Sequence, residues 1–216
     1  IEIVLGIMRD PQANAVVDRK VADTLRDSVY TQMVWALDKL GVLPWWQCRV
    51  SPMELVYKPT GQRIIFRGAD DPQKSKGIKL RNGYFWALWF EELSEFAGME
   101  DVRTIKASVI RGGEAVTFYT YNPPMSAANW VNEAALDTPA TRLTHASSYL
   151  QVPREWLGET FIAEAEALKK LNERAYRHMY LGEVTGTGGQ VFNNLCLREL
   201  KPEEWQGLHT YSGLDF

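Results

Sequence analysis

Two adjacent carboxylates directly follow a run of large apolar residues. The segment WALWFEELSEF extends from Trp86 to Phe96 and places Glu91 and Glu92 immediately after Phe90. Neighbouring side chains in an extended or turning backbone point in different directions. One carboxylate can therefore help to hold a metal ion while the other aligns or activates a water molecule. Glu91 and Glu92 are accordingly the first candidates for catalytic residues.

The position of the two acids favours hydrolysis of a nucleotide, but a structural interpretation fits the spacing equally well. In an open α/β sheet the ligand lies outside the carboxyl ends of the strands, and Glu91 and Glu92 follow the predicted strand Phe85 to Phe90. Nucleotide hydrolases use such a pair, one acid supporting Mg²⁺ and one positioning the attacking water. Carboxylates also favour the first turn of a helix, so the pair can instead mark a helix start.

A second predicted strand ends in groups that suit phosphate recognition. The run Ala115 to Thr120 continues into Tyr121, Asn122 and two prolines. A hydroxyl and an amide at the carboxyl end of a neighbouring strand can sense a γ-phosphate, while the prolines stiffen the exit of the chain. The alternative is an ordinary Asn-Pro turn with no ligand.

The elements that would position these residues alternate between strands and helices. Leu25, Val29, Met33 and Leu37 recur on one helical face, and Gly41 supplies a stop. The patterns predict strands at Asn14 to Lys20, Met53 to Tyr57, Arg63 to Phe66, Phe85 to Phe90, Ala115 to Thr120 and Thr141 to His145, and helices at Leu25 to Leu40, Met99 to Ile110, Arg154 to Leu171 and Glu173 to Leu181. This alternation predicts an α/β fold with a largely parallel sheet.

Composition sets limits on the class of protein. The chain has 216 residues, of which 45% are hydrophobic and 24% charged, with a net charge of −3, so it offers no general attraction to nucleic acid or to an anionic membrane. Cys48 and Cys196 are isolated, which favours free thiols over a zinc site. No apolar run approaches the roughly 20 residues that span a bilayer. We expect a soluble, intracellular protein.

The beginning of the chain predicts a fragment. Ile1 to Met8 has the character of an apolar helix without its first residues, and no initiator Met precedes it. The phosphate-binding pattern GxxxxGK[ST] is absent from the sequence. Gly186 to Gly189 lacks the following lysine and is interpreted as a flexible connector.

Several segments occur in an order that resembles a known family. They are WFEELSEF, the strand ending in TYNPP, THASSYL at 144–150, AYRHMYLGE at 175–183, and the terminal GLDF at 213–216. Together they resemble the large subunit of the phage terminase, the motor that packages DNA into procapsids, and within it the PBSX-like branch. The resemblance covers nearly the whole chain.

The resemblance implies a fold and a division of the chain. Family members have a P-loop ATPase domain of the additional-strand, catalytic-glutamate type, followed by an RNase H-like nuclease domain. Residues 1–183 would be the ATPase domain, truncated at its N-terminus where the Walker A loop belongs. Residues 184–216 would be a linker and the first residues of the nuclease domain, with Asp215 as the first metal-binding aspartate of an incomplete nuclease site.

The resemblance also implies roles for particular residues. The opening segment matches the Walker B strand, with Glu91 supporting Mg²⁺ and contacting the ATP cofactor, and Glu92 as the catalytic carboxylate. Glu91 stands where the family more often has Asp. Thr120, Tyr121 and Asn122 match the motif that couples nucleotide state to DNA movement. An arginine finger is expected in such a ring, with Arg19, Arg103 and Arg111 as candidates, each of which can equally be a surface arginine.

The implied activity is ATP hydrolysis that drives packaging of double-stranded DNA. The implied partners are DNA, a portal protein, the terminase small subunit and further copies in a ring, all in the host cytoplasm and without a membrane. This segment by itself is expected to bind ATP poorly and not to turn it over. Two alternatives stay open at this point: another P-loop DNA motor such as a helicase, and a non-catalytic α/β interaction module.

Overall fold

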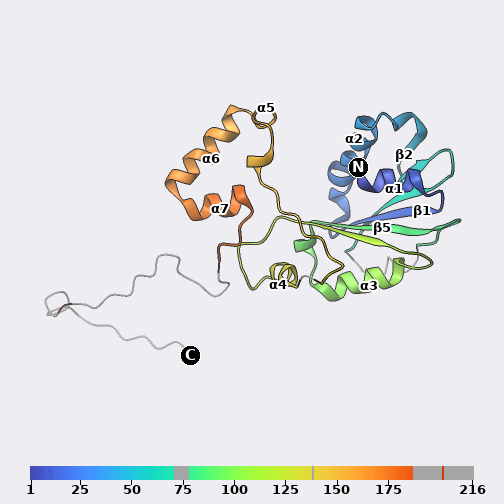
Figure 1. The fold of residues 1–216 in the computed structure, drawn as a ribbon. Coiled ribbons are helices and arrows are strands. Elements are labelled where there is room, and N and C mark those ends of the chain that lie inside the picture. The colour runs from blue at the N-terminus through green and yellow to red at the C-terminus, as the bar shows by residue number, and fades with distance from the viewer. Residues whose placement is uncertain (71–77, 138, 187–200, 202–216) are drawn as a thin grey trace.

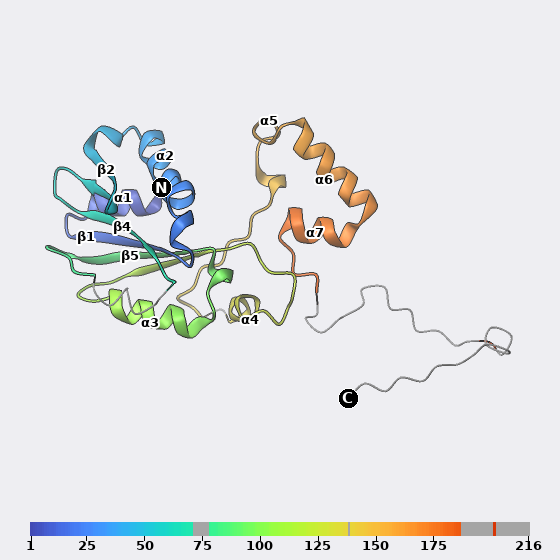
Figure 2. The same ribbon diagram turned by 180° about the vertical axis from the view of Figure 1, so that it is seen from behind.

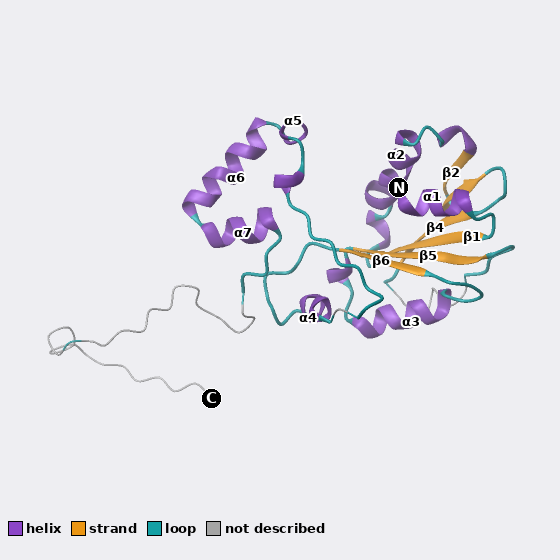
Figure 3. Ribbon diagram, viewed as in Figure 1, coloured by secondary structure: helices purple, strands orange, loops and turns teal. Residues whose placement is uncertain are grey.

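A six-stranded mixed sheet forms the centre of the molecule. The computed structural model describes residues 1–70, 78–137, 139–186 and 201. The strands lie in the order β2-β3-β4-β1-β5-β6 (Figures 1 and 3). Their bounds are β1 Ala13–Arg19, β2 Trp46–Val50, β3 Met53–Tyr57, β4 Arg63–Gly68, β5 Tyr84–Glu91 and β6 Val116–Thr120. The predicted α/β fold is confirmed.

Four of the strands are parallel, and these carry the candidate site. β4, β1, β5 and β6 pair in parallel, whereas β2, β3 and β4 pair in an antiparallel arrangement. The two strands predicted at Met53 to Tyr57 and Arg63 to Phe66 form a hairpin, β3 and β4, and Gly61 supplies the left-handed conformation in its turn with a φ of 76°. β1 is buried along nearly its whole length, as a central parallel strand with covered faces should be.

Helices cover both faces of the sheet. Figure 1 shows α1 (Glu2–Arg9) and α2 (Thr31–Lys39) on one side and α3 (Met99–Val109) and α4 (Trp130–Leu136) on the other. The upper cluster, packed under α1 and α2, includes Val4, Ile7, Val17, Leu37, Leu55 and Ile64. The lower cluster, packed against α3 and α4, includes Val16, Leu88, Phe90, Val102, Ile105 and Val131. Alternate residues of β1 thus enter opposite layers.

The first predicted long helix has the expected buried face but an irregular first half. Leu25, Val29, Met33 and Leu37 are all buried. A 3₁₀ turn at Ala22–Thr24 and a π-helical turn at Arg26–Tyr30 precede the regular helix α2. Gly41 ends it with a φ of 68°. The apolar spacing predicted which residues face the core, although it did not predict the change in helical winding.

The C-terminal part of the described chain is a small helical unit beside the sheet (Figures 1 and 2). It contains the 3₁₀ turn η6 (Tyr149–Gln151), α5 (Arg154–Leu157), α6 (Glu159–Leu171) and α7 (Glu173–Leu181). One predicted helix is divided between α5 and α6 at Gly158, whose φ is 80°. Four rings pack its interior: Tyr149, Phe161, Tyr176 and Tyr180.

One predicted strand is wrong. Thr141 to His145 forms a turn and irregular chain in the structure. All of its residues except the half-buried Arg142 are exposed, so its β-branched residues have no apolar layer to cover. A strand needs a hydrogen-bonding neighbour and a buried face, and this segment has neither in the described structure.

Candidate functional site

Three parallel strands end side by side at the edge where the candidate residues lie. Glu91 is the last residue of β5. In the register of the sheet Arg19 of β1 pairs with Glu91, and Glu91 pairs with Thr120 of β6. The three residues therefore form one row across the carboxyl ends of the strands. This is the edge at which open α/β sheets bind their ligands.

Arg19 contacts two carboxylates at this edge. Its Nε lies 3.3 Å from Glu91 Oε2, and its terminal nitrogen lies 3.4 Å from Glu95 Oε1. The side chains of Arg19 and Glu91 are only 15% and 16% exposed. Although burial opposes the charge of Arg19, its hydrogen bond to Glu95 and the nearby charges of Glu91, Glu95 and Glu92 raise its pKa. Arg19 is therefore firmly cationic and bound within its own chain.

One carboxylate oxygen of Glu91 is buried against Arg19 without forming a hydrogen bond. Its Oε2 is buried and has no hydrogen-bond partner, and the facing Nε of Arg19 also has none, so the pair is in ionic contact without hydrogen-bond geometry. Burial raises the pKa of Glu91, the charge of Arg19 lowers it, and Glu92 and Glu95 raise it. A buried, unsatisfied carboxylate oxygen is a suitable ligand for a hard cation such as Mg²⁺.

The backbone at Glu92 separates the two acids. Glu92 has φ 52° and ψ 54°, and among the described residues it is the only non-glycine with a positive φ. This left-handed conformation costs a β-carbon-bearing residue about 1–2 kcal/mol. The 3₁₀ turn η5 (Leu93–Glu95) begins after it. Glu91 thus belongs to the strand and the kink at Glu92 redirects the next side chain, so the pair does not sit in the first turn of an α-helix.

The end of β6 is joined to β5 by side chains on both faces. Trp89 Nε1 donates a hydrogen bond to Thr120 Oγ1 at 2.7 Å. On the opposite face the rings of Phe90 and Tyr119 stack with centroids 5.6 Å apart and an interplanar angle of 16°. Sequence reasoning selected Thr120 but missed Trp89, which was interpreted only as part of an apolar strand.

Tyr121 and Asn122, the two residues after Thr120, differ in their burial. Tyr121 packs against the lower cluster, and burial raises its pKa, while the charge of Arg142 lowers it. Asn122 lies two residues beyond β6 and is exposed. The structure therefore brings Thr120 into the row with Glu91, whereas Asn122 lies outside that row.

Asp18 is a buried acid that sequence reasoning did not select. It is 0% exposed, and neither carboxylate oxygen has a hydrogen-bond partner. Burial raises its pKa from 3.8 to about 7, although the charge of Arg67 lowers it. The available signal was an acid directly after the apolar run of β1. Because alternate residues face opposite layers, Asp18 lies on the α3 side while Arg19 lies on the α1 side.

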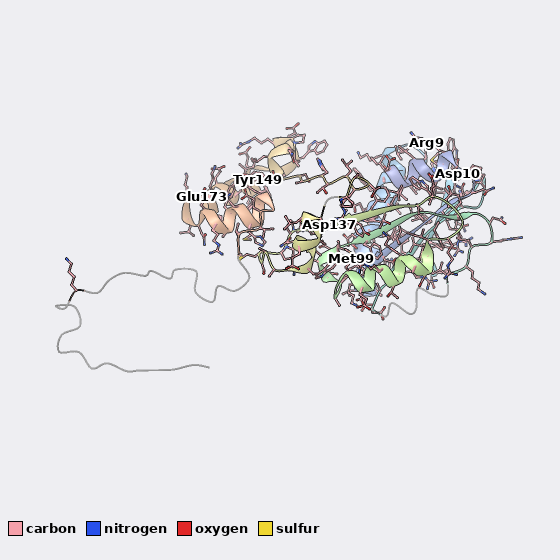
Figure 4. The ribbon with its side chains drawn as sticks, turned by 60° about the horizontal axis from the view of Figure 1, so that its bottom comes forward. Arg9, Asp10, Met99, Asp137, Tyr149 and Glu173 are labelled. Carbon is pink, nitrogen blue, oxygen red and sulfur yellow. The ribbon has the colours of Figure 1, made fainter. Side chains whose placement is uncertain are left out.

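The other two arginine-finger candidates lie away from the row. Arg103 of α3 lines a cavity of about 560 Å³ together with Lys106, Tyr119, Trp130 and Arg142. Figure 4 labels two further lining residues, Met99 and Asp137. Arg111 follows α3 and donates to the carbonyl of Ala107 at 3.5 Å. The structure places only Arg19 beside the paired acids. Asp215 and residues 187–189 lie outside the described residues.

The carboxylates at this edge favour a metal ion that is bound partly by the protein and partly by the phosphates of a ligand. Within the part of the chain that the structure describes, no group of three or more His, Cys, Asp or Glu side chains could hold a metal by itself. Mg²⁺ in nucleotide sites is commonly held by one or two carboxylates together with substrate phosphates and waters. Glu91 suits that arrangement.

Among the described helices, none has the length and apolar character that a bilayer crossing requires.

Comparison with known proteins reveals close relatives. A family model described as phage terminase large subunit matches residues 1–183. The terminase large subunit of Bacillus phage SPP1 is 42% identical over 204 residues, which are 91% of this chain and 48% of that protein. The PBSX phage terminase large subunit of Bacillus subtilis (strain 168) is 33% identical over 95 residues, which are 44% of this chain and 21% of that protein. The chain thus spans about half the length of the SPP1 relative, and its match covers a smaller share of the PBSX relative.

A solved structure gives the fold comparison. The ATPase domain of the large terminase of Thermus phage P74-26 aligns with a TM-score of 0.52 at 16% identity, covering 84% of this chain and 80% of that one. At this identity the likeness concerns the fold alone. Together with the family match, it favours the terminase interpretation over a helicase. The chain belongs to the family of phage terminase large subunits, and its fold is that of a terminase ATPase domain.

Proposed function

We propose that this chain forms the part of the ATPase site that hydrolyses ATP, in the motor that drives packaging of double-stranded DNA into phage procapsids. The observation that carries the proposal is Glu91 Oε2, a buried and unsatisfied carboxylate oxygen at the end of β5, with Glu92 turned away by a left-handed backbone. The family of the chain supports the same conclusion. ATP and Mg²⁺ are the proposed cofactors.

Each residue of the edge has a proposed task. Glu91 supports the metal through its carboxylate, and Arg19 keeps that carboxylate ionised against the effect of burial. Glu92 aligns the attacking water and accepts its proton. Thr120 contacts the terminal phosphate, and the exposed Asn122 is proposed as a second contact to the nucleotide. Bound Mg²⁺ would supply neutralisation of the charge that develops on the phosphate oxygens.

The wider organisation is proposed from the family. Residues 1–183 would form the ATPase domain, and residues 184–216 would lead into a nuclease domain with Asp215 as a metal-binding residue. A phosphate-binding loop would precede Ile1, so the segment by itself would not turn over ATP. The working form would be a ring of copies that contacts a portal protein, the terminase small subunit and the DNA backbone in the host cytoplasm.

The test is ATP hydrolysis by a full-length large subunit that carries this segment. Glu92→Gln removes the proton acceptor but keeps the size of the side chain. We expect turnover to fall by about 100-fold or more, within the range for loss of a general base, while nucleotide binding is retained. Glu100→Gln, an exposed acid in the first turn of α3, is the matched control. Equal turnover in the Glu92→Gln variant and wild type would show that Glu92 is not the catalytic carboxylate.

A further inference from the structure

Trp89 lies on the same strand as the metal-supporting acid and is hydrogen-bonded to the residue proposed to contact phosphate. It precedes Glu91 by two positions on β5, so the two side chains leave the same face of the strand. Its indole Nε1 reaches Thr120 Oγ1 on β6 at 2.7 Å. Thr120 itself pairs with Glu91 in the sheet register. Trp89 and Thr120 are therefore hydrogen-bonded at the edge of the sheet, and Glu91 lies beside Thr120 in the register.

The chemistry of the indole determines the polarity of this hydrogen bond. An indole N–H can only donate, whereas a threonine hydroxyl can donate once and accept twice. Thr120 must therefore be the acceptor in its bond with Trp89. The single hydroxyl hydrogen of Thr120 is left for another partner, and that partner must be an acceptor.

We propose that Trp89 is a positioning residue, which holds the Thr120 hydroxyl as a hydrogen-bond donor toward the phosphate end of the nucleotide. This inference rests on the proposed ATPase function. Phosphate oxygens carry no hydrogen and can only accept, so a hydroxyl that is already accepting from Trp89 has the required polarity. Without the indole, the Thr120 hydroxyl is free to rotate and to direct its hydrogen elsewhere.

The surroundings keep the indole in place. Trp89 packs against the upper cluster of apolar residues, as does Phe118 on β6, its partner in the sheet register. On the other face Phe90 stacks on Tyr119. Thr120 is β-branched, which restricts its χ1 rotation. The donor and the acceptor therefore lie on strands that are joined on both faces, so the bond requires little additional ordering.

A double-mutant cycle tests the proposal in a full-length large subunit that carries this segment. Trp89→Phe keeps an aromatic ring and removes the N–H donor, and Thr120→Val keeps the β-branched shape and removes the hydroxyl. We expect Trp89→Phe to lower kcat/KM for ATP by about 2-fold to 10-fold, the range for one neutral hydrogen bond. The same substitution should have no further effect in the Thr120→Val background.

Two controls separate positioning from general packing. Trp86→Phe removes an indole from the same strand, where it packs against Gly6 and the upper cluster. It should leave ATP turnover unchanged once folding is verified by circular dichroism. Thr120→Ser retains a hydroxyl and should keep the sensitivity to Trp89→Phe. If Trp89→Phe does not fold, Trp89→Leu, which also removes the N–H donor, replaces it in the same cycle.

The possible outcomes distinguish this inference from the proposed function. If wild type hydrolyses ATP in a Glu92-dependent manner but Trp89→Phe has the same effect with and without the Thr120 hydroxyl, the positioning role is wrong and the ATPase assignment stands. An unchanged kcat/KM in Trp89→Phe has the same meaning. If the full-length wild type does not hydrolyse ATP, the proposed function itself fails.

Discussion

The buried acid Asp18 makes the stability of this protein dependent on pH in an unusual direction. Its side chain is fully buried and neither oxygen has a hydrogen-bond partner, so the native state favours the protonated form. Replacement by asparagine keeps the size of the side chain and removes the titration. The pH dependence of the free energy of unfolding should therefore differ between wild type and Asp18→Asn.

The magnitude follows from the pKa of this carboxyl. Burial raises the pKa of Asp18 from 3.8 to about 7, against a smaller opposite effect of Arg67. Between these values the folded chain holds a proton that the unfolded chain has released, so stability falls as pH rises and is level above about pH 7. The interval is about three pH units, which corresponds to about 4 kcal/mol at roughly 1.4 kcal/mol for each unit.

The assay is urea unfolding of the chain at a series of pH values from 4 to 8. The quantity of interest is the free energy of unfolding of wild type minus that of Asp18→Asn, because other titrating groups cancel in the difference. It should fall by several kcal/mol as pH rises toward 7. The buried amide has its own unsatisfied cost of about 1–3 kcal/mol, which shifts the difference without changing its slope.

The control is Asp38→Asn, an exposed aspartate on α2. This variant measures the effect of removing an exposed carboxylate over the same range. A flat difference profile for Asp18→Asn would show that the native state does not favour the protonated form of Asp18, and the reasoning from burial would be refuted. A difference that rises with pH would imply a favourable partner for the charged carboxylate.

Two further predictions concern the row of residues at the sheet edge. Arg19→Gln removes the charge that lowers the pKa of Glu91, so the acid limb of the rate–pH profile of the full-length protein should move to higher pH. The control Arg103→Gln, on α3, should leave that limb in place. If the profiles of Arg19→Gln and wild type coincide, Arg19 does not control the ionisation of Glu91. Glu92→Gly should abolish turnover yet stabilise the fold by up to ~1 kcal/mol, since glycine relieves the left-handed backbone strain at an entropic cost. Both effects on stability are measured by thermal unfolding, in which Glu91→Gly, within β5, should instead destabilise the fold. A Glu92→Gly variant less stable than Glu91→Gly would contradict the strain argument.

Much of the scaffold was predictable from short segments. The apolar spacing from Leu25 to Leu37 identified the buried face of a helix, and the apolar run before Glu91 identified a buried strand. Such patterns are local because burial on one face requires a periodicity of the chain itself. Thr141 to His145 shows the limit of this reasoning. The sequence predicted a strand there, but within the described residues no neighbouring strand pairs with it and no apolar layer covers it.

The contacts within the candidate site depended on the packing of distant strands. The amino-acid sequence alone indicated that Glu91 and Glu92 follow one strand and that Thr120 ends another, because each lies after its own apolar run. The partnership of Arg19 with Glu91 and the donation from Trp89 to Thr120 were decided by sheet order and register. These pairings join residues far apart in the chain, and no local periodicity encodes which strands lie side by side. The tertiary structure determines which strands are neighbours, and it thereby determines which charged groups and hydrogen-bond donors are in contact at the site.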